Sequence, residues 1–256
     1  MSTIGFDRLH PALQHHIVNS LGWRTLRPLQ QEAIAPVLDG AHVLAMAPTA
    51  GGKTEAAVLP VLSRMLSEDW RGLTVLYVCP LKALLNNLYE RLTGYASLIG
   101  RTVGLWHGDV TASVRTRLQR ERPDILLTTP ESLESMLVST TVDHRQWFRD
   151  LRTVIVDEAH AFVGDDRGWH LLAVLARISC IAGRELQRIA LSATIGNPAD
   201  VLAWLTTGCA APAHVVNPPA PAATPPQVTL DYVGNLANAA TVISRLHRGT
   251  KRLVFV

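Results

Sequence analysis

The stretch HVLAMAPTAGGKT, residues 42–54, joins an apolar run to a glycine-rich loop and a lysine–threonine pair. It ends like the phosphate-binding pattern G-x-x-x-x-G-K-[ST], although Ala47 stands where that pattern has its first glycine. Gly51 and Gly52 permit the positive φ values and the close backbone approach that a phosphate group requires. Lys53 would then reach the β- and γ-phosphates, and the hydroxyl of Thr54 would bind Mg²⁺. The alternative is a glycine turn that caps a strand and happens to precede a lysine.

Short apolar runs recur along the chain, with longer segments between them. Each is continuous rather than alternating, as is typical of strands buried on both faces of a parallel sheet. The runs are HVLAMA (42–47), TVLYVC (74–79), TVGLWH (102–107), DILLTT (124–129), TVIVDE (153–158) and RIALSA (188–193). The intervening segments have room for the helix that a parallel crossover needs. The sequence therefore predicts an open α/β fold, a mostly parallel sheet with helices on both faces. Pro60 is expected to kink or shorten the helix after the loop.

The two ends of the chain have a different composition. Residues 6–38 indicate helices, one in LHPALQHHIVNSL and another in LQQEAIAPVL. The segment NPPAPAATPPQ (217–227) has five prolines and no large apolar residue, as in a stiff linker. A possible strand at 228–233, a helix around 237–247 and the apolar RLVFV follow it. We expect a main domain over 1–213, a linker over 214–227 and the truncated start of a second domain over 228–256.

The composition is that of a folded protein outside the membrane. Of the 256 residues 48% are hydrophobic and 18% charged, which argues against general disorder. The net charge of +3 permits a nucleic-acid partner without indicating one. Cys79, Cys180 and Cys209 lie far apart, which disfavours a zinc site or a disulfide framework. No signal peptide and no membrane-spanning stretch is visible, so we expect a cytoplasmic protein.

Distinctive clusters follow the predicted strands, where ligands bind in open α/β sheets. After the loop come PLKALLNN (80–87), HGD (107–109), TTPES (128–132), DEAH (157–160) and SAT (192–194). Asp157 would hold Mg²⁺, which binds through few carboxylates together with phosphate oxygens. Glu158 would position or deprotonate the attacking water. The alternative for this pair is an ordinary acidic cap at a helix N-terminus.

The ordered clusters APTAGGKT, PLKAL, TTPES, DEAH and SAT resemble motifs I, Ia, Ib, II and III of a superfamily 2 DEAD/DEAH-box helicase. PLKALLNN, DEAHAFVGDDRG and LSATIGNP are most similar to the large helicase-related (Lhr-like) proteins. The resemblance implies a first RecA-like, P-loop NTPase domain that hydrolyses ATP with Mg²⁺, with Lys53, Asp157 and Glu158 as catalytic residues. It also implies an ATP-binding set comprising Gln30, Thr49, Ala50, Gly51, Gly52, Lys53, Thr54 and Glu55. Gln30 resembles the Q-motif glutamine that bonds adenine; the alternative is a surface glutamine.

The resemblance implies two further groups of residues. His160, Ser192 and Thr194 would couple the γ-phosphate site to nucleic acid, although such hydroxyls also cap helices. One strand's sugar-phosphate backbone would be contacted by Pro80, Leu81, Lys82, His107, Gly108, Thr129, Pro130 and Glu131. The arginines at 115, 117, 120 and 122 favour a solvated helix face, and Trp106 and Trp169 favour packing over base stacking.

The resemblance favours an ATP-dependent DNA helicase or translocase that moves on a single strand. An RNA helicase and a nucleotide-dependent nucleic-acid-binding switch without unwinding remain open as alternatives. Such motors take an arginine finger from a second RecA-like domain in cis. We therefore expect the 256 residues alone to bind ATP·Mg²⁺ weakly, to hydrolyse it poorly and to unwind nothing.

Overall fold

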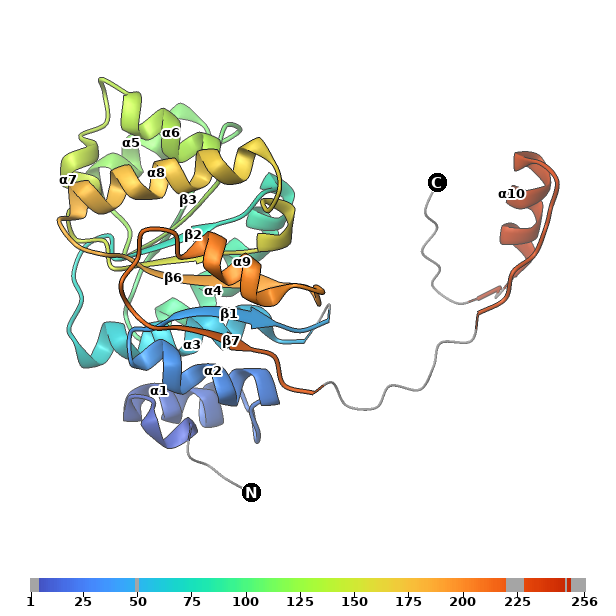
Figure 1. The fold of residues 1–256 in the computed structure, drawn as a ribbon, viewed down its shortest axis with the longest axis horizontal. Coiled ribbons are helices and arrows are strands. Elements are labelled where there is room, and N and C mark those ends of the chain that lie inside the picture. The colour runs from blue at the N-terminus through green and yellow to red at the C-terminus, as the bar shows by residue number, and fades with distance from the viewer. Residues whose placement is uncertain (1–4, 49–50, 220–227, 247, 250–256) are drawn as a thin grey trace. The chain divides into compact units, whose positions relative to one another are not determined.

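The computed structural model describes residues 5–48, 51–219, 228–246 and 248–249. The chain divides into two compact units, and the division falls after Pro219 (Figure 1). The first unit holds every motif singled out above, and each unit is described by itself.

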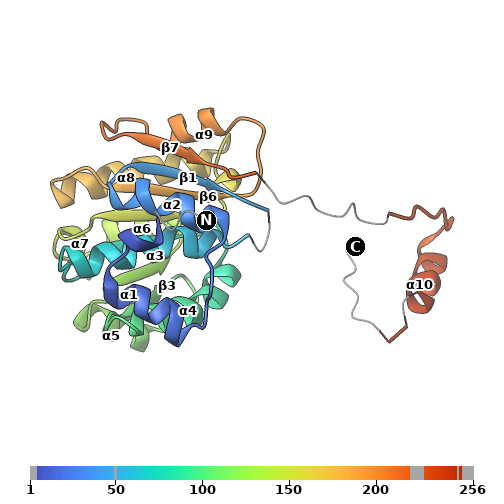
Figure 2. The same ribbon diagram turned by 90° about the horizontal axis from the view of Figure 1, so that it is seen from below.

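The first unit is built on a parallel sheet that has seven strands in the described residues, in the order β3-β4-β2-β5-β6-β1-β7. The strands are β1 (His42–Met46), β2 (Val75–Val78), β3 (Val103–Trp106), β4 (Ile125–Thr128), β5 (Thr153–Val156), β6 (Gln187–Ser192) and β7 (Ala213–Val216). Every described pairing is parallel, for example Val78 with Val156 and Val43 with Ile189. The predicted open α/β architecture is confirmed. Figure 2 shows β7 and α9 at one end of the sheet and β3 near α4 and α5 at the other.

Helices cover both faces of this sheet, because alternate residues of each strand point to opposite sides. Val43 and Ala45 of β1 belong to one buried cluster, whereas Leu44 and Met46 belong to the other. The first cluster includes residues of α1 (Pro11–His15), α2 (Pro28–Leu38), α3 (Lys53–Ser67) and α4 (Lys82–Ser97). The second includes residues of α5 (Ala112–Arg120), α6 (Pro130–Val138), α7 (His144–Phe148), α8 (Asp166–Ala182) and α9 (Pro198–Leu205). Figure 1 shows α5–α8 above the sheet and α1–α3 below it.

Helix α3 departs from the expectation for Pro60. The helix continues from Lys53 to Ser67 with Pro60 buried in its interior. Proline removes one backbone hydrogen bond, but α3 is buried along most of its length and packs extensively on α2. Tertiary packing therefore keeps the helix intact past the proline.

The N-terminal segment contains a short 3₁₀ turn, η1 (Phe6–Arg8), and the two helices expected from the sequence. The first changes from α-helical to π-helical in η2 (His16–Ser20), and Gly22 follows with a φ of +69°. Trp23 N–H then donates to the carbonyl of Ile17 at 3.0 Å. This widened turn carries the chain to the start of α2, where Gln30 lies.

The expected boundary at residue 213 is wrong. Residues 213–216 form β7, which pairs with β1 through His42 and Ala213 at one end and Ala45 and Val216 at the other. The linker expected over 214–227 therefore contains three residues of the sheet. Only Val216 of β7 is buried, because the strand lies at the sheet edge, so it lacks the continuous apolar pattern of the inner strands.

The described part of the second unit contains one helix, α10 (Leu236–Arg245), close to the helix predicted around 237–247. The strand expected at 228–233 is absent from these described residues. A strand needs a paired neighbour, and the described part of this unit provides none. The strand expected in RLVFV lies outside the described residues. Among the helices that the structure describes, none has the length and apolar character needed to cross a bilayer.

Candidate nucleotide and nucleic-acid sites

The clusters that follow the strands meet at one edge of the sheet, because parallel strands all end on the same side. The strand order divides this edge into two halves. The neighbouring strands β5, β6 and β1 bring Asp157, Ser192 and the loop after Met46 together. The neighbouring strands β3, β4 and β2 bring His107, Thr129 and Pro80 together. A cleft lies in each half.

The loop after β1 requires its two glycines. A Cβ on Gly51 would lie 2.5 Å from the Cβ of Ala47, and one on Gly52 would lie 2.5 Å from Nε2 of Gln30. Gly52 also has a φ of +80°, which other residues rarely adopt. Ala47 itself is buried at the strand end. The predicted loop residues Thr49 and Ala50 lie outside the described residues.

Lys53 begins α3 and bends back over the loop. Its Nζ donates to the carbonyl of Ala47 at 3.0 Å and to that of Pro48 at 3.4 Å. The N-terminus of α3 lies behind it, so backbone N–H groups and a lysine face the same space, as anion binding requires. The ammonium is held by neutral carbonyls, and an anionic phosphate would be a stronger partner for it.

Thr54 and Glu55, the next residues of α3, are contacted from α4. Arg91 Nη2 donates to Thr54 Oγ1 at 2.6 Å, and Arg91 Nε lies 3.5 Å from Glu55 Oε1. The hydroxyl of Tyr95 also donates to Glu55 Oε1, at 3.0 Å. The ring of Tyr95 meets that of Trp23 edge to face, with centroids 6.1 Å apart. This clamp between α3 and α4 was not predicted from the sequence.

Asp157 and Glu158 follow β5 beside the loop. Asp157 is 8% exposed, and its carboxylate accepts from Tyr77 Oη at 2.6 Å and from the Glu158 N–H at 2.9 Å. Burial raises the pKa of Asp157, and these two hydrogen bonds oppose the rise. Burial, and the nearby Asp157, raise the pKa of Tyr77 well above its usual value. Glu158 has a φ of +48°, a strained backbone conformation of the kind that recurs at functional sites.

Gln30 lies at the base of the same cleft and is buried. Its Oε1 accepts from the Arg27 N–H at 2.9 Å, and its Nε2 donates to the Gly52 carbonyl at 3.4 Å. The alternative of a surface glutamine is therefore wrong. The cleft has a volume of about 700 Å³ and is lined by Trp23, Arg24, Thr25, Arg27, Gln30, Gly51, Gly52, Lys53, Thr54, Glu55, Leu84, Asn87, Leu88, Arg91, Asp157 and Glu158. Trp23, Arg24 and Thr25 were missed, although their place just before Gln30 was a usable signal.

Two of the three predicted coupling residues are in contact. His160 Nδ1 lies 3.2 Å from Ser192 Oγ and 3.5 Å from Glu158 Oε2. His160 is exposed on η3 (Ala159–Ala161), so it is not a packed core histidine. Thr194 is exposed beyond the end of β6.

The second cleft has a volume of about 630 Å³. Its lining includes Pro80, Leu81, Lys82, His107, Gly108, Thr129 and Glu131 among the predicted residues, together with Ala83, Trp106, Arg115, Ser132, Ser135 and Arg167. Pro130 is buried as the first residue of α6 and does not line this cleft. Because its lining is rich in donors and has backbone near the surface, the cleft suits a sugar-phosphate chain.

Ion pairs and hydrogen bonds fix the walls of this second cleft. Lys82 Nζ lies 2.8 Å from Asp109 Oδ1, and Arg167 reaches both Glu131, at 2.8 Å, and the Pro80 carbonyl, at 3.2 Å. His107 is 4% exposed, and its Nε2 bonds Asn86 Oδ1 while its Nδ1 accepts from the Asp109 N–H. Its imidazole therefore holds the wall of the cleft together.

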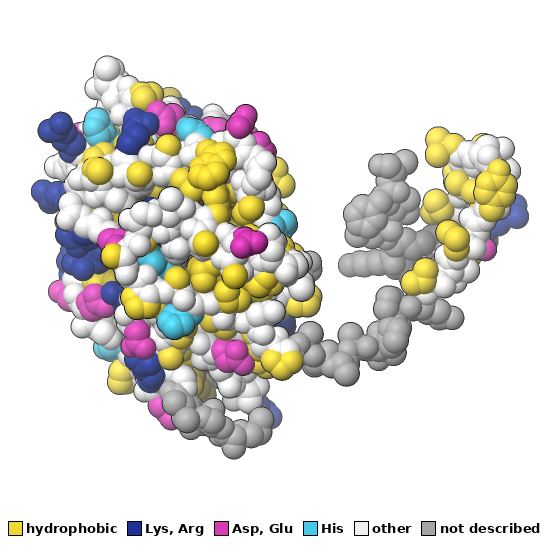
Figure 3. Space-filling view, in the orientation of Figure 1, with side chains coloured by type: hydrophobic (Ala, Val, Ile, Leu, Met, Phe, Trp, Pro, Cys, Tyr) yellow, Lys and Arg dark blue, Asp and Glu magenta, His cyan; other side chains and the backbone are white. Residues whose placement is uncertain are grey.

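The arginines and tryptophans near this cleft only partly match the expectation. Trp106 is 6% exposed and packs edge to face on Trp147 with centroids 5.6 Å apart, which confirms packing. Trp169 on α8 is 61% exposed, so the prediction that it is a packing residue is wrong. Figure 3 shows hydrophobic side chains at the surface on the face that carries α8. Arg115 is no solvated side chain either, because it donates to the carbonyls of His107 and Gly108.

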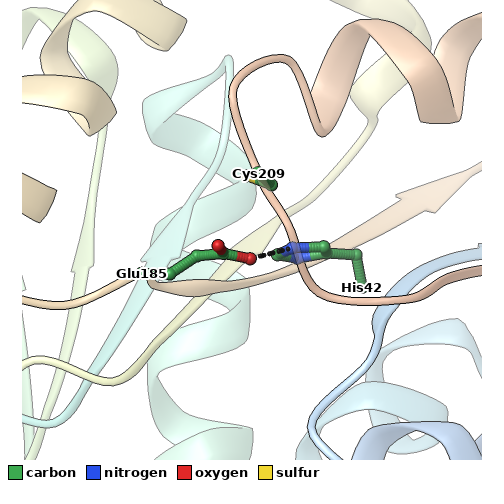
Figure 4. Close-up of side chains that lie close together, drawn as sticks. All are labelled: His42, Glu185 and Cys209. Atoms are coloured by element: carbon green, nitrogen blue, oxygen red, sulfur yellow. Dashed lines mark hydrogen bonds and ion pairs between the residues drawn. The ribbon is translucent and has the colours of Figure 1, made fainter.

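A third cluster, His42, Glu185 and Cys209, has the composition of a metal site but not its chemistry (Figure 4). His42 Nδ1 accepts from the Arg188 N–H at 2.9 Å, so its proton is on Nε2, which donates to Glu185 Oε1 at 2.9 Å. A metal ligand needs a free lone pair on the ring nitrogen, and neither nitrogen offers one. Glu185 also accepts from the N–H groups of Ala210 and Ala211. The cluster joins β1 to the segment before β7.

Comparisons with known proteins agree with this geometry. Residues 27–201 match the model of the DEAD/DEAH box helicase family. The chain is 42% identical over 200 residues to the Lhr helicase/uracil glycosylase of Escherichia coli, which covers 70% of this chain and 13% of that protein. The structure of Mycobacterium smegmatis helicase Lhr bound to ssDNA and AMP-PNP has a TM-score of 0.73 at 36% identity, over 84% of this chain and 28% of the other. The crystal structure of DUF1998 helicase MrfA bound to DNA has a TM-score of 0.70 at 27% identity, over 81% of this chain and 29% of the other.

A parallel sheet with a glycine loop and Lys53–Thr54 after β1, and with Asp157–Glu158 after β5, defines a RecA-like P-loop NTPase domain. Within this class the chain belongs to the DEAD/DEAH box helicase family. The predicted similarity to the large helicase-related proteins is confirmed. Membership of the family implies nucleotide binding. The chain spans about one eighth of the length of the E. coli relative (13%).

Proposed function

We propose that this chain is the first motor domain of an ATP-dependent DNA helicase or translocase. The observation that carries the proposal is the placing of two clefts at one sheet edge. One is lined by Lys53, Thr54 and Glu158, the other by Lys82 and Glu131, and both border α4, the helix that follows β2. A motor that couples ATP hydrolysis to movement on a strand needs its two ligands on one rigid support.

In the nucleotide cleft, Lys53 and the N–H groups of Gly51 and Gly52 bind the phosphates, and Gln30 reads the adenine. Glu158 orients and deprotonates the attacking water. Its carboxylate lines the cleft within 3.5 Å of His160, which bonds Ser192 in turn. Thr194 completes the link towards the nucleic acid.

The nucleotide cleft also fits Mg²⁺, which prefers oxygen ligands. Thr54 Oγ1 already accepts from a cation, the guanidinium of Arg91, and the buried Asp157 supplies a carboxylate nearby. Thr54 and Asp157 would hold the ion. When bound, it would neutralise charge that develops on the transferred phosphoryl group.

In the second cleft, the residues around Pro80, Lys82, Gly108, Thr129 and Glu131 contact the backbone of one strand. Sequence-independent gripping uses such backbone N–H groups and short polar side chains. DNA is favoured over RNA because the two similar helicases above are described as bound to ssDNA and to DNA. Residues 228–256 would begin a second RecA-like domain that supplies the arginine finger. The three widely separated cysteines suit a reducing compartment, so we also propose that the protein is cytoplasmic.

The test is the ATPase activity of the protein with both motor domains, measured with single-stranded DNA and RNA of equal length and sequence. We expect DNA to stimulate turnover more than RNA does. Glu158→Gln should keep nucleotide binding and lower turnover about 10²- to 10⁴-fold, the contribution of a general base. Stimulation by RNA alone would instead indicate an RNA helicase. ATP-dependent DNA binding without translocation or strand separation would indicate a switch.

A further inference from the structure

Arg91 lies in the nucleotide cleft but belongs to none of the motifs that define it. It projects from α4, with its side chain 45% exposed, and lines the same space as Lys53 and Asp157. Its shortest contact, at 2.6 Å, is with Thr54 Oγ1, the hydroxyl proposed above as a metal ligand. The proposed metal and the guanidinium of Arg91 would thus compete for one oxygen.

The position of Arg91 is supported by its neighbours. Tyr95 lies four residues further along α4, on the same face of the helix. Both side chains contact Oε1 of Glu55, whose side chain is almost buried. Because Tyr95 also packs against Trp23, the Glu55 carboxylate is held in place and keeps Arg91 next to the phosphate-binding loop.

We propose that Arg91 is a nucleotide-binding residue that takes the place of the metal on Thr54 and contacts the phosphates of a metal-free nucleotide. The inference rests on the proposed function. A guanidinium has five donors, so it can bond Thr54 and a phosphate oxygen at the same time. When Mg²⁺ accompanies the nucleotide, repulsion between the two cations moves Arg91 off Thr54, while Glu55 retains it in the cleft. Arg91 therefore reduces the dependence of nucleotide affinity on Mg²⁺.

The test measures the affinity for AMP-PNP by calorimetry, once with excess Mg²⁺ and once with EDTA. We expect Arg91→Ala to weaken binding about tenfold in EDTA, the loss of a charge-assisted hydrogen bond, and to change it by less than about twofold with Mg²⁺. Arg91→Gln, which keeps a polar group but shortens the side chain and loses the charge, should behave in the same way. Arg117→Ala, an exposed arginine on α5, is the matched control for loss of one positive charge.

An equal loss of affinity with and without Mg²⁺ would overturn the proposal, because Arg91 would then be an ordinary ligand or a structural residue. An unchanged affinity in both conditions would overturn it too. Failure of the proposed function gives a different result: the wild type would not bind AMP-PNP even with Mg²⁺, or Lys53→Ala would bind it normally. Thermal unfolding of each variant separates misfolding from lost binding, and Arg91→Gln supplies the answer where Arg91→Ala does not fold.

Discussion

The phenol of Tyr77 donates a 2.6 Å hydrogen bond to Oδ2 of Asp157 inside the core of the protein. Tyr77 pairs with Ile155 in the neighbouring strand β5, so the aspartate two residues later comes within reach of its side chain. Tyr77 is fully buried, and its hydroxyl therefore depends on this acceptor. The bond links the strand that leads to the second cleft with a residue of the nucleotide cleft.

Tyr77→Phe is expected to lower the free energy of unfolding by about 1–3 kcal/mol, because it leaves a buried carboxylate with one bond fewer. It should also weaken binding of Mg²⁺·AMP-PNP, since Asp157 loses the group that orients it. Chemical denaturation and calorimetry measure the two effects. The control is Tyr89→Phe on α4, which removes a hydroxyl from a tyrosine that packs partly buried against the core. Equal effects of the two changes would contradict a specific role for the Tyr77 hydroxyl.

Lys53→Ala is expected to abolish detectable nucleotide binding while lowering stability by less than about 1 kcal/mol. The ammonium bonds only neutral carbonyls in the described structure, and such bonds contribute little to folding. In the proposed function its main partner is the phosphate of the nucleotide. Fluorescence titration with a labelled nucleotide measures the loss, and an unchanged affinity would remove the phosphate-binding role from this loop.

His42 gives the first unit a stability that depends on pH. Burial lowers the pKa of His42, against the opposing effect of its hydrogen bond to Glu185, and the nearby Arg188 lowers the pKa further. The unfolded chain therefore takes up a proton near pH 6.5, before the folded protein does, and stability falls as the pH drops below that value. His42→Gln does not titrate, so the stability advantage of the wild type over it should shrink below pH 6.5, by at most about 1.4 kcal/mol per pH unit.

Urea unfolding at several pH values between 5 and 8 measures this difference. His15→Gln, a change at an exposed histidine of α1, is the matched control. A wild-type advantage that stays constant across this range would contradict the assignment. Metal addition provides a second check, because the hydrogen bonds of His42 leave no lone pair on its ring for Zn²⁺, and the melting temperature should not rise with it.

The inner strands and the order of the motifs were predictable because they depend on local sequence. A strand buried on both faces has to be apolar throughout, so β1, β2, β4, β5 and β6 are visible in the chain. The edge strand β7 was missed because only Val216 is buried. Residues such as Tyr77 and Arg91 were missed for another reason. From the sequence, Tyr77 looks like one more core residue and Arg91 like one more charge on a helix. Strand pairing brings Tyr77 to Asp157, and the packing of α4 beside α3 brings Arg91 to Thr54.

Arg167→Ala should weaken binding of single-stranded DNA about tenfold and leave nucleotide affinity without DNA unchanged. The guanidinium of Arg167 donates to Glu131 at the start of α6 and to the Pro80 carbonyl just before α4. It therefore fixes the distance between the starts of these two helices across the second cleft. The substitution should lower the free energy of unfolding by less than about 1 kcal/mol, since the ion pair between Arg167 and Glu131 is partly exposed. Arg167→Lys should restore only part of the affinity, because one ammonium does not reproduce the planar fork. Arg177→Ala is the matched control: it breaks a 2.7 Å pair with Glu134 that joins α8 to α6, as the pair of Arg167 with Glu131 does, but away from the cleft. Fluorescence anisotropy measures the affinities, and equal losses in Arg167→Ala and Arg177→Ala would show that helix packing, rather than the wall of the cleft, controls DNA binding.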